Sequence, residues 1–283
     1  MVKPEKIGIS DIRSRLKVID PKSHKGTFGH TLIIGGSHGK IGAVCLASKA
    51  ALKTGCGLVT AYVPECGYQI LQTSIPEVMV LTDTARNHLS EIKFDIAPQA
   101  IGIGPGMGQE QATQKAFHEF LKSEHVPLVV DADALNILAK NPSWLKLLPP
   151  KTILTPHEKE LERLIGTWND DEEKILKAYS FSRRHNVMIV VKGAPTIVIA
   201  DGQIIENTTG NAALATAGSG DVLTGIITSL VAQGYDQMNA AIIGVYIHGL
   251  TADLAISETS IHSFIASDII NFIGKAYLSV EEP

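Results

Sequence analysis

The sequence predicts an α/β fold in which a mainly parallel sheet is flanked by helices on both faces. Short apolar runs alternate with longer stretches of helical periodicity along most of the chain, a pattern typical of parallel sheets covered by helices. Glycine-rich or polar groups follow directly after most of these runs, as they do at the ligand-binding edge of an open sheet. There is no evident linker, repeat or low-complexity segment, so we expect one domain over residues 1–283.

The first part of the chain predicts a polar extension followed by two strands. Residues 1–24 are polar and weakly periodic, and we expect an N-terminal extension, with a short helix, that packs on the domain. The apolar runs at 30–34 and 58–63 predict strands. Between them, the small residues of 41–54 predict a helix that ends at Gly55.

The middle of the chain continues the alternation. Apolar runs predict four further strands, at 100–103, 127–130, 153–154 and 187–191. A helix-like stretch that reaches Glu124 follows the first of these runs, and a charged helix follows the third. We expect the polar groups at the ends of these strands to face one cleft.

The last two strands are predicted to form a hairpin. The runs TIVIA (196–200) and QIIEN (203–207) flank Asp201-Gly202, which is a strong signal for a tight turn. We therefore expect an antiparallel ribbon at an edge of the sheet. After residue 210 the pattern is helical to the C-terminus.

Composition and charge argue against several classes of protein. A formal net charge of −4, without a Lys/Arg run, argues against nucleic acid as the main partner. The three cysteines form no C-x-x-C pair, which indicates buried thiols in a reducing compartment. The most apolar long segment, 240–256, is interrupted by His248 and Asp253, which predicts a core helix rather than a membrane span. Because the N-terminus lacks the apolar core of a signal peptide, we expect a cytoplasmic protein.

The stretch TAGSGDVLTGIITSL, residues 216–230, places a single carboxylate at the start of an amphipathic helix. Asp221 could be a simple N-cap, since Asp is favoured there. A cap needs no flanking glycines, however, whereas Gly218-Ser219-Gly220 allows several backbone N–H groups to converge on an anion. The pattern therefore indicates an anion hole beside a carboxylate, which suits phosphoryl transfer.

Phosphoryl transfer also needs positive charge, usually from a metal held by carboxylates and phosphates. Asp131, Asp133 and Glu160 are candidate ligands, although acids are common at helix starts and could serve only there. Lys192 would neutralise phosphate charge if it lay in the cleft, and would otherwise be a surface residue. His157, taken alone, is more simply a capping or surface histidine.

Two familiar nucleotide-binding signatures are absent. Neither Gly-Lys pair is followed by Ser or Thr, so there is no Walker A loop. A dinucleotide fingerprint that begins at Gly102 would need a glycine where Met107 stands. The sequence therefore gives poor support to a standard nicotinamide dehydrogenase.

Six motifs together point to one known family. They are GG-S-x-x-x-x-GA (35–43), GPGMG (104–108), DADAL (131–135), TPHEKE (155–160), KGAPT (192–196) and N-x-x-G-N-x-x-x-A-x-x-GSGDVLTG (207–225). In this combination the chain closely resembles the ADP/ATP-dependent NAD(P)H-hydrate dehydratases of the ribokinase-like superfamily. The resemblance runs from about residue 24 to the C-terminus. Its last motif is highly specific, whereas the glycine runs alone are weak signals.

The resemblance implies a metabolite-repair enzyme of the carbon–oxygen lyase class. Such an enzyme uses ATP or ADP to convert NADH or NADPH that has taken up water at C6 of the nicotinamide ring back to the reduced cofactor. Our mechanistic hypothesis is that Asp221 accepts the proton of the C6 hydroxyl as this group attacks the terminal phosphoryl. The amides of Gly218, Ser219 and Gly220 would stabilise the transferred charge. Elimination of phosphate would then regenerate NAD(P)H.

The resemblance also implies which residues form the site. The hydrate would be bound by Ala43, Gly106, His157 and Asp221. The adenine nucleotide would be bound by Lys192, Gly193, Ala194, Pro195, Thr196, Gly220 and Asn211. Asn211 could otherwise be a simple turn residue. Magnesium is implied, with Glu160 and Asp131 as protein ligands and with phosphates and waters completing its shell.

The sequence departs from the family pattern on the expected substrate side. Lys40-Ile41 stands where relatives usually carry Tyr, and Lys159 stands where they usually carry Gly. The chain has no room for the epimerase domain of some relatives, so we expect action on one epimer of the hydrate, the S epimer. Because relatives are often tetramers, we expect a homotetramer.

Two alternatives remain open. A hydroxyethylthiazole- or hydroxymethylpyrimidine-type small-molecule kinase of the same superfamily would share the GSGD and metal elements but would keep a stable phosphorylated product. The KGAPT and TPH motifs favour the dehydratase. A nucleotide-sensing protein without catalysis is the second alternative, against which the intact Asp221 argues. The sequence does not distinguish ATP from ADP, or NADH hydrate from NADPH hydrate.

Overall fold

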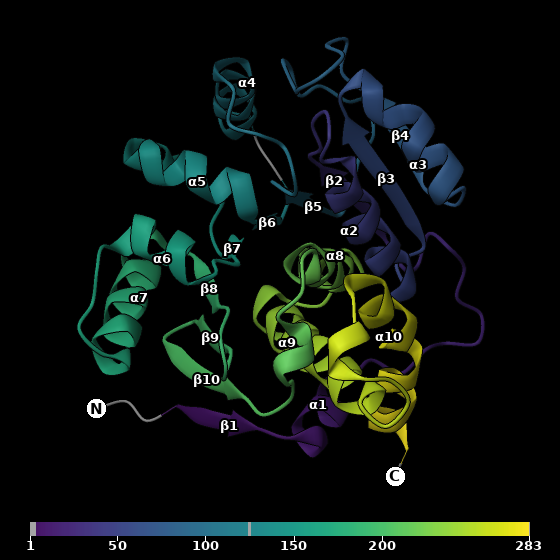
Figure 1. The fold of residues 1–283 in the computed structure, drawn as a ribbon, viewed down its shortest axis with the longest axis vertical. Helices are drawn as coiled ribbons and strands as arrows, with labels where there is room; N and C mark the ends of the chain where they lie inside the picture. The colour runs from purple at the N-terminus through teal and green to yellow at the C-terminus, as the bar shows by residue number, and fades with distance from the viewer. Residues whose placement is uncertain (1–3, 124–125, 283) are drawn as a thin grey trace.

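A computed structural model describes residues 4–123 and 126–282, which fold around a ten-stranded sheet (Figure 1). The sheet order is β1-β10-β9-β8-β7-β6-β5-β2-β3-β4. The strands are β1 (Glu5–Ile7), β2 (His30–Ile34), β3 (Leu58–Val63), β4 (Met79–Thr82), β5 (Ala100–Ile103), β6 (Leu128–Val130), β7 (Ile153–Leu154), β8 (Met188–Val191), β9 (Ile197–Ala200) and β10 (Gln203–Asn207). All neighbours pair in parallel except β8–β9 and β9–β10. The predicted α/β fold is confirmed.

Helices cover both faces of the sheet. They are α1 (Ile9–Arg15), α2 (Ile41–Lys53), α3 (Tyr68–Ser74), α4 (Gln111–Leu121), α5 (Ala132–Lys140), α6 (Glu158–Ile165), α7 (Asp171–His185), α8 (Ser219–Ala232), α9 (Gln237–Ala255) and α10 (Ala266–Glu281), with short 3-10 helices η1 (Glu65–Gly67), η2 (Pro142–Leu147), η3 (Ala212–Leu214) and η4 (Ile261–Ser263). One face buries an apolar cluster with α2, α8, α9 and α10, and the other buries a second cluster with α4, α5 and α7. Successive strand residues alternate between them, since Val129 belongs to the first cluster while Leu128 and Val130 belong to the second.

Most of the predicted elements are confirmed. Strands β2, β3, β5 and β7 have the bounds of the predicted runs, and β6 and β8 begin one residue later. The helix expected at 41–54 is α2, which ends at Lys53. The helix expected to reach Glu124 is α4, which ends at Leu121, and Glu124 itself lies outside the described residues.

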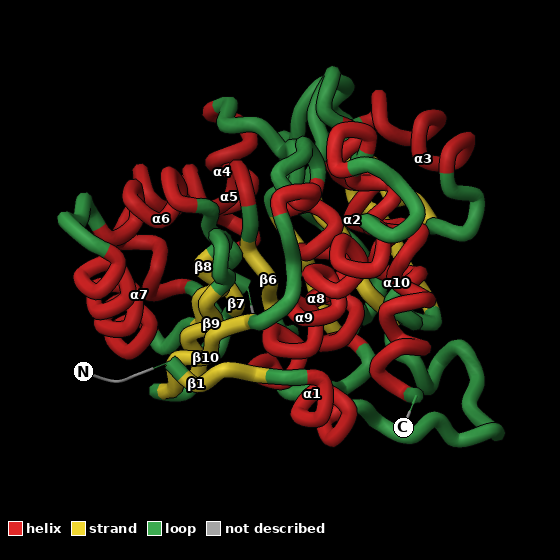
Figure 2. Tube along the Cα trace, turned by 60° about the horizontal axis from the view of Figure 1, so that its bottom comes forward, coloured by secondary structure: helices red, strands yellow, loops and turns green. Residues whose placement is uncertain are grey.

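The N-terminal end of the chain contains one strand that was not predicted. The expected short helix is α1, but β1 precedes it and pairs in parallel with β10 (Figure 2). The predicted β9–β10 ribbon, with its turn at Asp201-Gly202, is confirmed at this end of the sheet, with β1 added outside it. A three-residue strand is too short to give a periodic signal, which explains why β1 was missed. Helix α3 and strand β4 were also not predicted.

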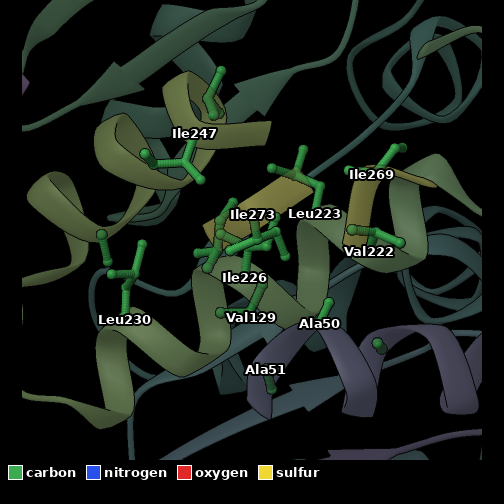
Figure 3. Close-up of a cluster of buried hydrophobic side chains, with 14 of the residues drawn as sticks. Ala50, Ala51, Val129, Val222, Leu223, Ile226, Leu230, Ile247, Ile269 and Ile273 are labelled. Atoms are coloured by element: carbon green, nitrogen blue, oxygen red, sulfur yellow. The ribbon is translucent and has the colours of Figure 1, made fainter. Parts of the chain in front are cut away.

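The small residues of α2 allow its backbone to approach α8 closely. A Cβ atom at Gly225 would lie 2.0 Å from the carbonyl oxygen of Ala47, so the contact requires glycine. Ala50 and Ala51 belong to the same apolar cluster as the buried side chains of α8 (Figure 3). This packing holds α8 against β2, β5 and β6, with its first turns at the carboxyl ends of the strands.

The most apolar segment of the chain forms part of the core. Residues 240–249 of α9 are all buried, His248 among them, so the prediction of a core helix is confirmed. Within residues 4–123 and 126–282, no helix is both long enough and apolar enough to cross a bilayer. Cys45, Cys56 and Cys66 are free thiols.

Candidate active site

The polar groups that follow the strands meet at one edge of the sheet. Strands β2, β5, β6, β7 and β8 are neighbours and pair in parallel, so their carboxyl ends lie side by side. Asp131 follows β6, His157 follows β7 and Lys192 follows β8. The amide of Lys192 donates to the carbonyl of Pro156 at 3.0 Å, which ties two of these strand ends together. The predicted convergence of these groups is confirmed.

A lysine and two buried carboxylates form the charged centre of this edge. The Nζ atom of Lys192 lies 2.8 Å from Asp131 Oδ1 and 4.0 Å from Glu160 Oε2. The side chains of Asp131 and Glu160 are only 2% and 4% exposed. Thr224 of α8 donates to the other oxygen of Asp131 at 2.7 Å. Both oxygens of Asp131 are therefore bonded, and Lys192 balances the negative charge of the pair.

The N-terminus of α8 opens toward this charged centre. The helix begins at Ser219, with Gly218 as its N-cap in the left-handed conformation (φ 87°) and without a side-chain cap. A Cβ atom at Gly220 would lie 3.1 Å from Lys192 Nζ, so the glycine lets the ammonium approach the helix backbone. The first amides of a helix have no partner within the helix and favour an anion. The sequence Gly218-Ser219-Gly220 therefore presents donors beside a lysine, as an anion hole requires.

Asp221 does not cap α8, so the simpler of the two interpretations of its position is wrong. It is the third residue of the helix, and its carboxylate is partly buried without a hydrogen bond to any residue in the described part of the chain. The pKa of Asp221 is raised to about 7, chiefly by burial and secondly by the negative charge of Asp131, while Lys192 opposes this effect. A carboxyl group with these properties can exchange a proton near neutral pH, as a general base must.

Glu160 and His157 form a reciprocal pair at the start of α6. The backbone amide of His157 donates to Glu160 Oε2 at 3.0 Å, and the amide of Glu160 donates to His157 Nδ1 at 3.3 Å. Burial raises the pKa of Glu160 to about 7 although Lys192 lowers it, so loss of water outweighs the lysine. Burial also lowers the pKa of His157, with Lys192 as the second cause. His157 is therefore a neutral ring with half of its side chain (51%) exposed, and its predicted hydrate contact would use that exposed part.

Two of the three candidate metal-binding acids lie together, and the third lies apart from them. Asp131 and Glu160 both face Lys192. Asp133 instead accepts from the amide of Gly108 at 3.0 Å and from the side chain of Gln109 at 3.0 Å. Over the described ranges 4–123 and 126–282, no group of three or more His, Cys, Asp or Glu side chains is arranged to hold a metal ion. A metal at the Asp131–Glu160 pair would therefore need further ligands from outside the protein.

The GPGMG loop brings the two other predicted hydrate-site residues together. Gly106 has a positive φ of 60°, and a Cβ atom there would lie 3.1 Å from the Cβ of Ala43 and 2.6 Å from the carbonyl oxygen of Lys40. Gly104 packs even more closely, since a Cβ atom there would lie 1.9 Å from the carbonyl oxygen of Asp131. Glycines at these positions thus join the Ala43 turn to the turn that carries Asp131.

The KGAPT loop follows Lys192 and is open to solvent. Residues 193–195 are exposed, and the Thr196 hydroxyl donates to the carbonyl of Gly193 at 3.0 Å. These residues also border a cavity of about 830 Å³ between α7 and the β8–β10 part of the sheet. The loop is therefore accessible, as a nucleotide-binding loop must be.

Asn211 does not present its side chain to a ligand in this structure. Its amide nitrogen donates to Asp253 Oδ1 at 2.9 Å, and its oxygen accepts from the amide of Ala213 at 2.9 Å. The side chain therefore caps η3 and fastens the loop to α9. A nucleotide contact at Asn211 would have to come from its backbone.

Sequence reasoning did not identify three polar residues that support the site. Thr224 binds Asp131, His248 contacts Ser219, and Asp253 binds Asn211. His248 and Asp253 did carry a signal, because polar residues within an otherwise apolar helix need a partner when buried. That signal was used only to argue against a membrane span. Thr224 lies in the last of the six motifs, but nothing in the sequence pairs it with Asp131.

The chain has extensive similarity to one family of known proteins. Residues 31–275 match the model of a family described as NAD(P)H-hydrate dehydratase. The bifunctional NAD(P)H-hydrate repair enzyme of Moorella thermoacetica is 39% identical over 281 residues, which are 95% of this chain and 53% of that protein. The ADP-dependent (S)-NAD(P)H-hydrate dehydratase of Neisseria meningitidis is 39% identical over 241 residues, 82% of this chain and 79% of that protein. The chain thus spans about half the length of its bifunctional relatives.

Solved structures give the same result for the fold. The crystal structure of the ADP/ATP-dependent NAD(P)H-hydrate dehydratase from Bacillus subtilis, co-crystallised with ATP and Mg²⁺, has a TM-score of 0.85 at 30% identity and covers 99% of this chain and 100% of that one. A ribokinase-like superfamily protein from Enterococcus faecalis has a TM-score of 0.83 at 22% identity and covers 99% of this chain and 97% of that one. The predicted ribokinase-like fold is confirmed.

Proposed function

Because the chain belongs to the NAD(P)H-hydrate dehydratase family, we propose that it catalyses the nucleotide-dependent dehydration of NADH hydrate or NADPH hydrate to NAD(P)H. The substrate is the S epimer, as in the name of the Neisseria relative, and ATP or ADP is the phosphoryl donor. The single observation that carries this proposal is Asp221. Its carboxyl has a pKa near neutrality and no hydrogen-bond partner among residues 4–123 and 126–282, and it lies on the first turn of α8, whose amides would form the anion hole.

Asp221 acts as the general base of the first step. The C6 hydroxyl of the hydrated ring gives its proton to the Asp221 carboxylate as its oxygen attacks the terminal phosphorus of the nucleotide. A new bond forms between this oxygen and phosphorus, and the bond to the bridging oxygen breaks, which releases ADP from ATP or AMP from ADP. The step converts hydroxide, a poor leaving group, into phosphate, a good one.

The charge on the transferred group is met by the start of α8 and by Lys192. The amides of Gly218 and Gly220 lie at the positive end of the helix dipole, whereas the amide of Ser219 donates to the carbonyl of Thr216 at 3.3 Å. Lys192 lies beside Gly220, so its ammonium can move from Asp131 to the phosphates without a change in the backbone. In the second step the ring nitrogen donates its electron pair, the C6–oxygen bond breaks, phosphate leaves, and C5 loses a proton. The product is the dihydronicotinamide.

Asp131 and Glu160 fit a magnesium ion. Both carboxylates face one ammonium group, so the space between them already favours a positive charge. Magnesium in phosphoryl-transfer sites is commonly held by one or two carboxylates, with phosphates and waters as the other ligands. When bound, it supplies positive charge to the phosphates of the nucleotide. Loss of turnover on addition of EDTA, restored by excess Mg²⁺, is the expected result.

The direct test incubates the protein with NADH hydrate of resolved epimers, Mg²⁺ and either ATP or ADP. We expect the absorbance of reduced nicotinamide to rise with the S epimer alone, with one phosphate released per NADH formed. Separate runs with ATP and ADP, and with NADH hydrate and NADPH hydrate, establish the preferred pair. Consumption of nucleotide with a stable phosphorylated product, without NADH, would show a small-molecule kinase instead.

The Asp221→Asn variant tests the role of the base. A general base of this kind contributes about 10²–10⁴-fold to the rate. We expect kcat to fall by this factor while binding of ATP, measured by calorimetry, is retained. A variant that turns over at the parent rate would remove Asp221 from the mechanism.

The cellular setting and the assembly are the remaining parts of the proposal. Three free thiols suit a reducing compartment, and we propose a cytoplasmic location. We also propose a homotetramer, since members of the resembled family are often tetramers. Light scattering coupled to size-exclusion chromatography tests the assembly, and a monomer would contradict it.

A further inference from the structure

Helix α9 contacts both ends of residues 208–219, which we call the linking segment; it comprises the connection from β10 to α8 and the first residue of α8, Ser219. Figure 1 shows α9 between α8 and the β9–β10 ribbon. None of the six motifs that indicate the function includes a residue of α9. Polar groups of α9 nevertheless bind the linking segment near its start, at residues 209–211, and at its last residue, Ser219. The described structure therefore joins the predicted site to a helix behind it.

His248 of α9 contacts the last residue of the linking segment. Its Nε2 atom lies 3.0 Å from the carbonyl oxygen of Ser219 and 3.2 Å from the Ser219 hydroxyl. A carbonyl oxygen can only accept, so Nε2 carries the hydrogen and donates it to Ser219. Burial lowers the pKa of His248 to about 4, which keeps the ring neutral at physiological pH. The imidazole is thus a fixed donor to the first residue of α8.

Asp253 of α9 binds the first part of the linking segment. Its carboxylate accepts from the amide of Gly210 at 2.7 Å and from the side chain of Asn211 at 2.9 Å. Gly210 has a positive φ of 104°, so the loop turns sharply at this point. The two bonds hold that turn against the helix.

A glycine of α9 allows the loop to lie directly on the helix backbone. A Cβ atom at Gly249 would lie 2.7 Å from the carbonyl carbon and oxygen of Thr209 and 2.3 Å from its hydroxyl. The Thr209 hydroxyl donates to the carbonyl of Tyr246 at 2.8 Å. Residues 246, 249 and 253 lie on one stripe of the helix, since they are three and four positions apart. The loop therefore follows one face of α9 over two turns.

We propose that His248 and Asp253 are positioning residues for catalysis, His248 by fixing the amides that receive the phosphoryl group and Asp253 by fixing the loop that holds the nucleotide. The inference rests on the proposed function, because it assigns the two residues separate effects on that reaction. Neither side chain touches the reacting atoms. His248 therefore governs kcat, and Asp253 governs the KM for the nucleotide.

The test of His248 compares a donor with an apolar side chain. His248→Leu removes the hydrogen bond to Ser219, and a displacement of the anion hole by about 1 Å costs on the order of 10²-fold in kcat. His248→Gln carries an amide that can still donate to Ser219, and we expect it to recover most of this loss. The nucleotide KM stays near the parent value in both variants. If His248→Leu does not fold, His248→Asn supplies the same contrast, because its shorter amide does not reach Ser219.

The test of Asp253 measures nucleotide binding. Asp253→Ala leaves the Gly210 amide and the Asn211 side chain without their acceptor, and we expect the nucleotide KM and the calorimetric Kd for ATP to rise about tenfold. Asp253→Asn keeps one acceptor oxygen and should lie between the parent and Asp253→Ala. The matched control is Ile243→Val, a core change ten residues earlier on α9, which should move neither parameter by more than about threefold.

Equal loss in His248→Leu and His248→Gln would overturn the role of His248, because a structural role alone gives no rescue by a donor. An unchanged Kd for ATP in Asp253→Ala would overturn the role of Asp253. Failure of the proposed function gives a different result, since the parent protein itself would then not produce NADH. In that case the calorimetric Kd for ATP of Asp253→Ala still tests the role of Asp253.

Discussion

The end of β6 and the start of α8 each carry an aspartate, and the two carboxylates have opposite surroundings. Asp131 accepts from Lys192 at 2.8 Å and from Thr224 at 2.7 Å, so both of its oxygens are bonded. Asp221 has no hydrogen bond of this kind, and its pKa is raised to about 7. The difference shows that two neighbouring acids acquire separate roles through their partners. Asp131 holds a cation in place, whereas Asp221 is available to a proton.

The largest expected effect is the loss of kcat in Lys192→Met, a variant that changes the surroundings of both aspartates. The substitution removes the ammonium that faces both Asp131 and the start of α8. Loss of one preorganised charge or donor at a transition state costs about 10²–10³-fold in kcat. Steady-state kinetics with saturating nucleotide measures it. Lys49→Met, on the exposed side of α2, is the control, and equal kcat in the two variants would exclude Lys192 from the reaction.

A smaller effect is expected in Asp221→Asn, whose unfolding free energy should exceed that of the parent at high pH. A carboxyl whose pKa is raised in the folded state destabilises the fold once it ionises, and this cost develops as the pH rises from about 4 to about 7. The full rise of this pKa to about 7 corresponds to about 4 kcal/mol, and solvent around the partly buried side chain screens part of it. The variant should therefore match the parent near pH 4 and exceed its unfolding free energy by about 2 kcal/mol at pH 8.

Urea unfolding at both pH values measures this difference. Asp95→Asn, at an exposed position, is the control and should show no such pH dependence. Equal stability of Asp221→Asn and the parent at pH 8 would mean that the carboxyl is solvated and not buried.

The smallest effect is expected on the unfolding free energy of Thr224→Val. This variant tests how much the hydrogen bond from Thr224 stabilises Asp131. Valine has the same shape, and it removes the donor to Asp131 Oδ2. A bond to a charged group contributes about 1.5–3 kcal/mol, so we expect a loss of about 1.5 kcal/mol in unfolding free energy. Thr228→Val is the matched control, since Thr228 is equally buried on α8 but donates to a backbone carbonyl. A larger loss in Thr228→Val would contradict the account.

Much of the site could be predicted because it depends on where strands end. Asp131, His157 and Lys192 each follow a short apolar run, and parallel strands bring such positions to one edge whatever the details of packing. The start of α8 was also visible in the sequence, since Gly218 and Gly220 flank it, but an anion hole there stays a prediction, because Gly218 is also needed as the left-handed N-cap (φ 87°). These inferences use only local pattern and one rule of topology.

The parts that could not be predicted depend on contacts between distant segments. Thr224 reaches Asp131 across 93 positions of the chain, and His248 reaches Ser219 across 29. Such pairs depend on how α8 and α9 pack in the fold. The hydrophobic periodicity of the sequence predicts helices and strands but not which side chains they bring together. Asn211 shows the same limit, because its side chain is bonded to Asp253 and to its own loop.

The pH dependence of kcat/KM tests the role of Asp221 most directly. A base must be ionised to act, so the parent value should rise with pH at unit slope and level off above about pH 7. With saturating Mg²⁺, the same rise should persist in Glu160→Gln, at a lower rate, and should be absent from the residual activity of Asp221→Asn. If Asp221→Asn keeps the rise near pH 7, another group is the base and the account is contradicted.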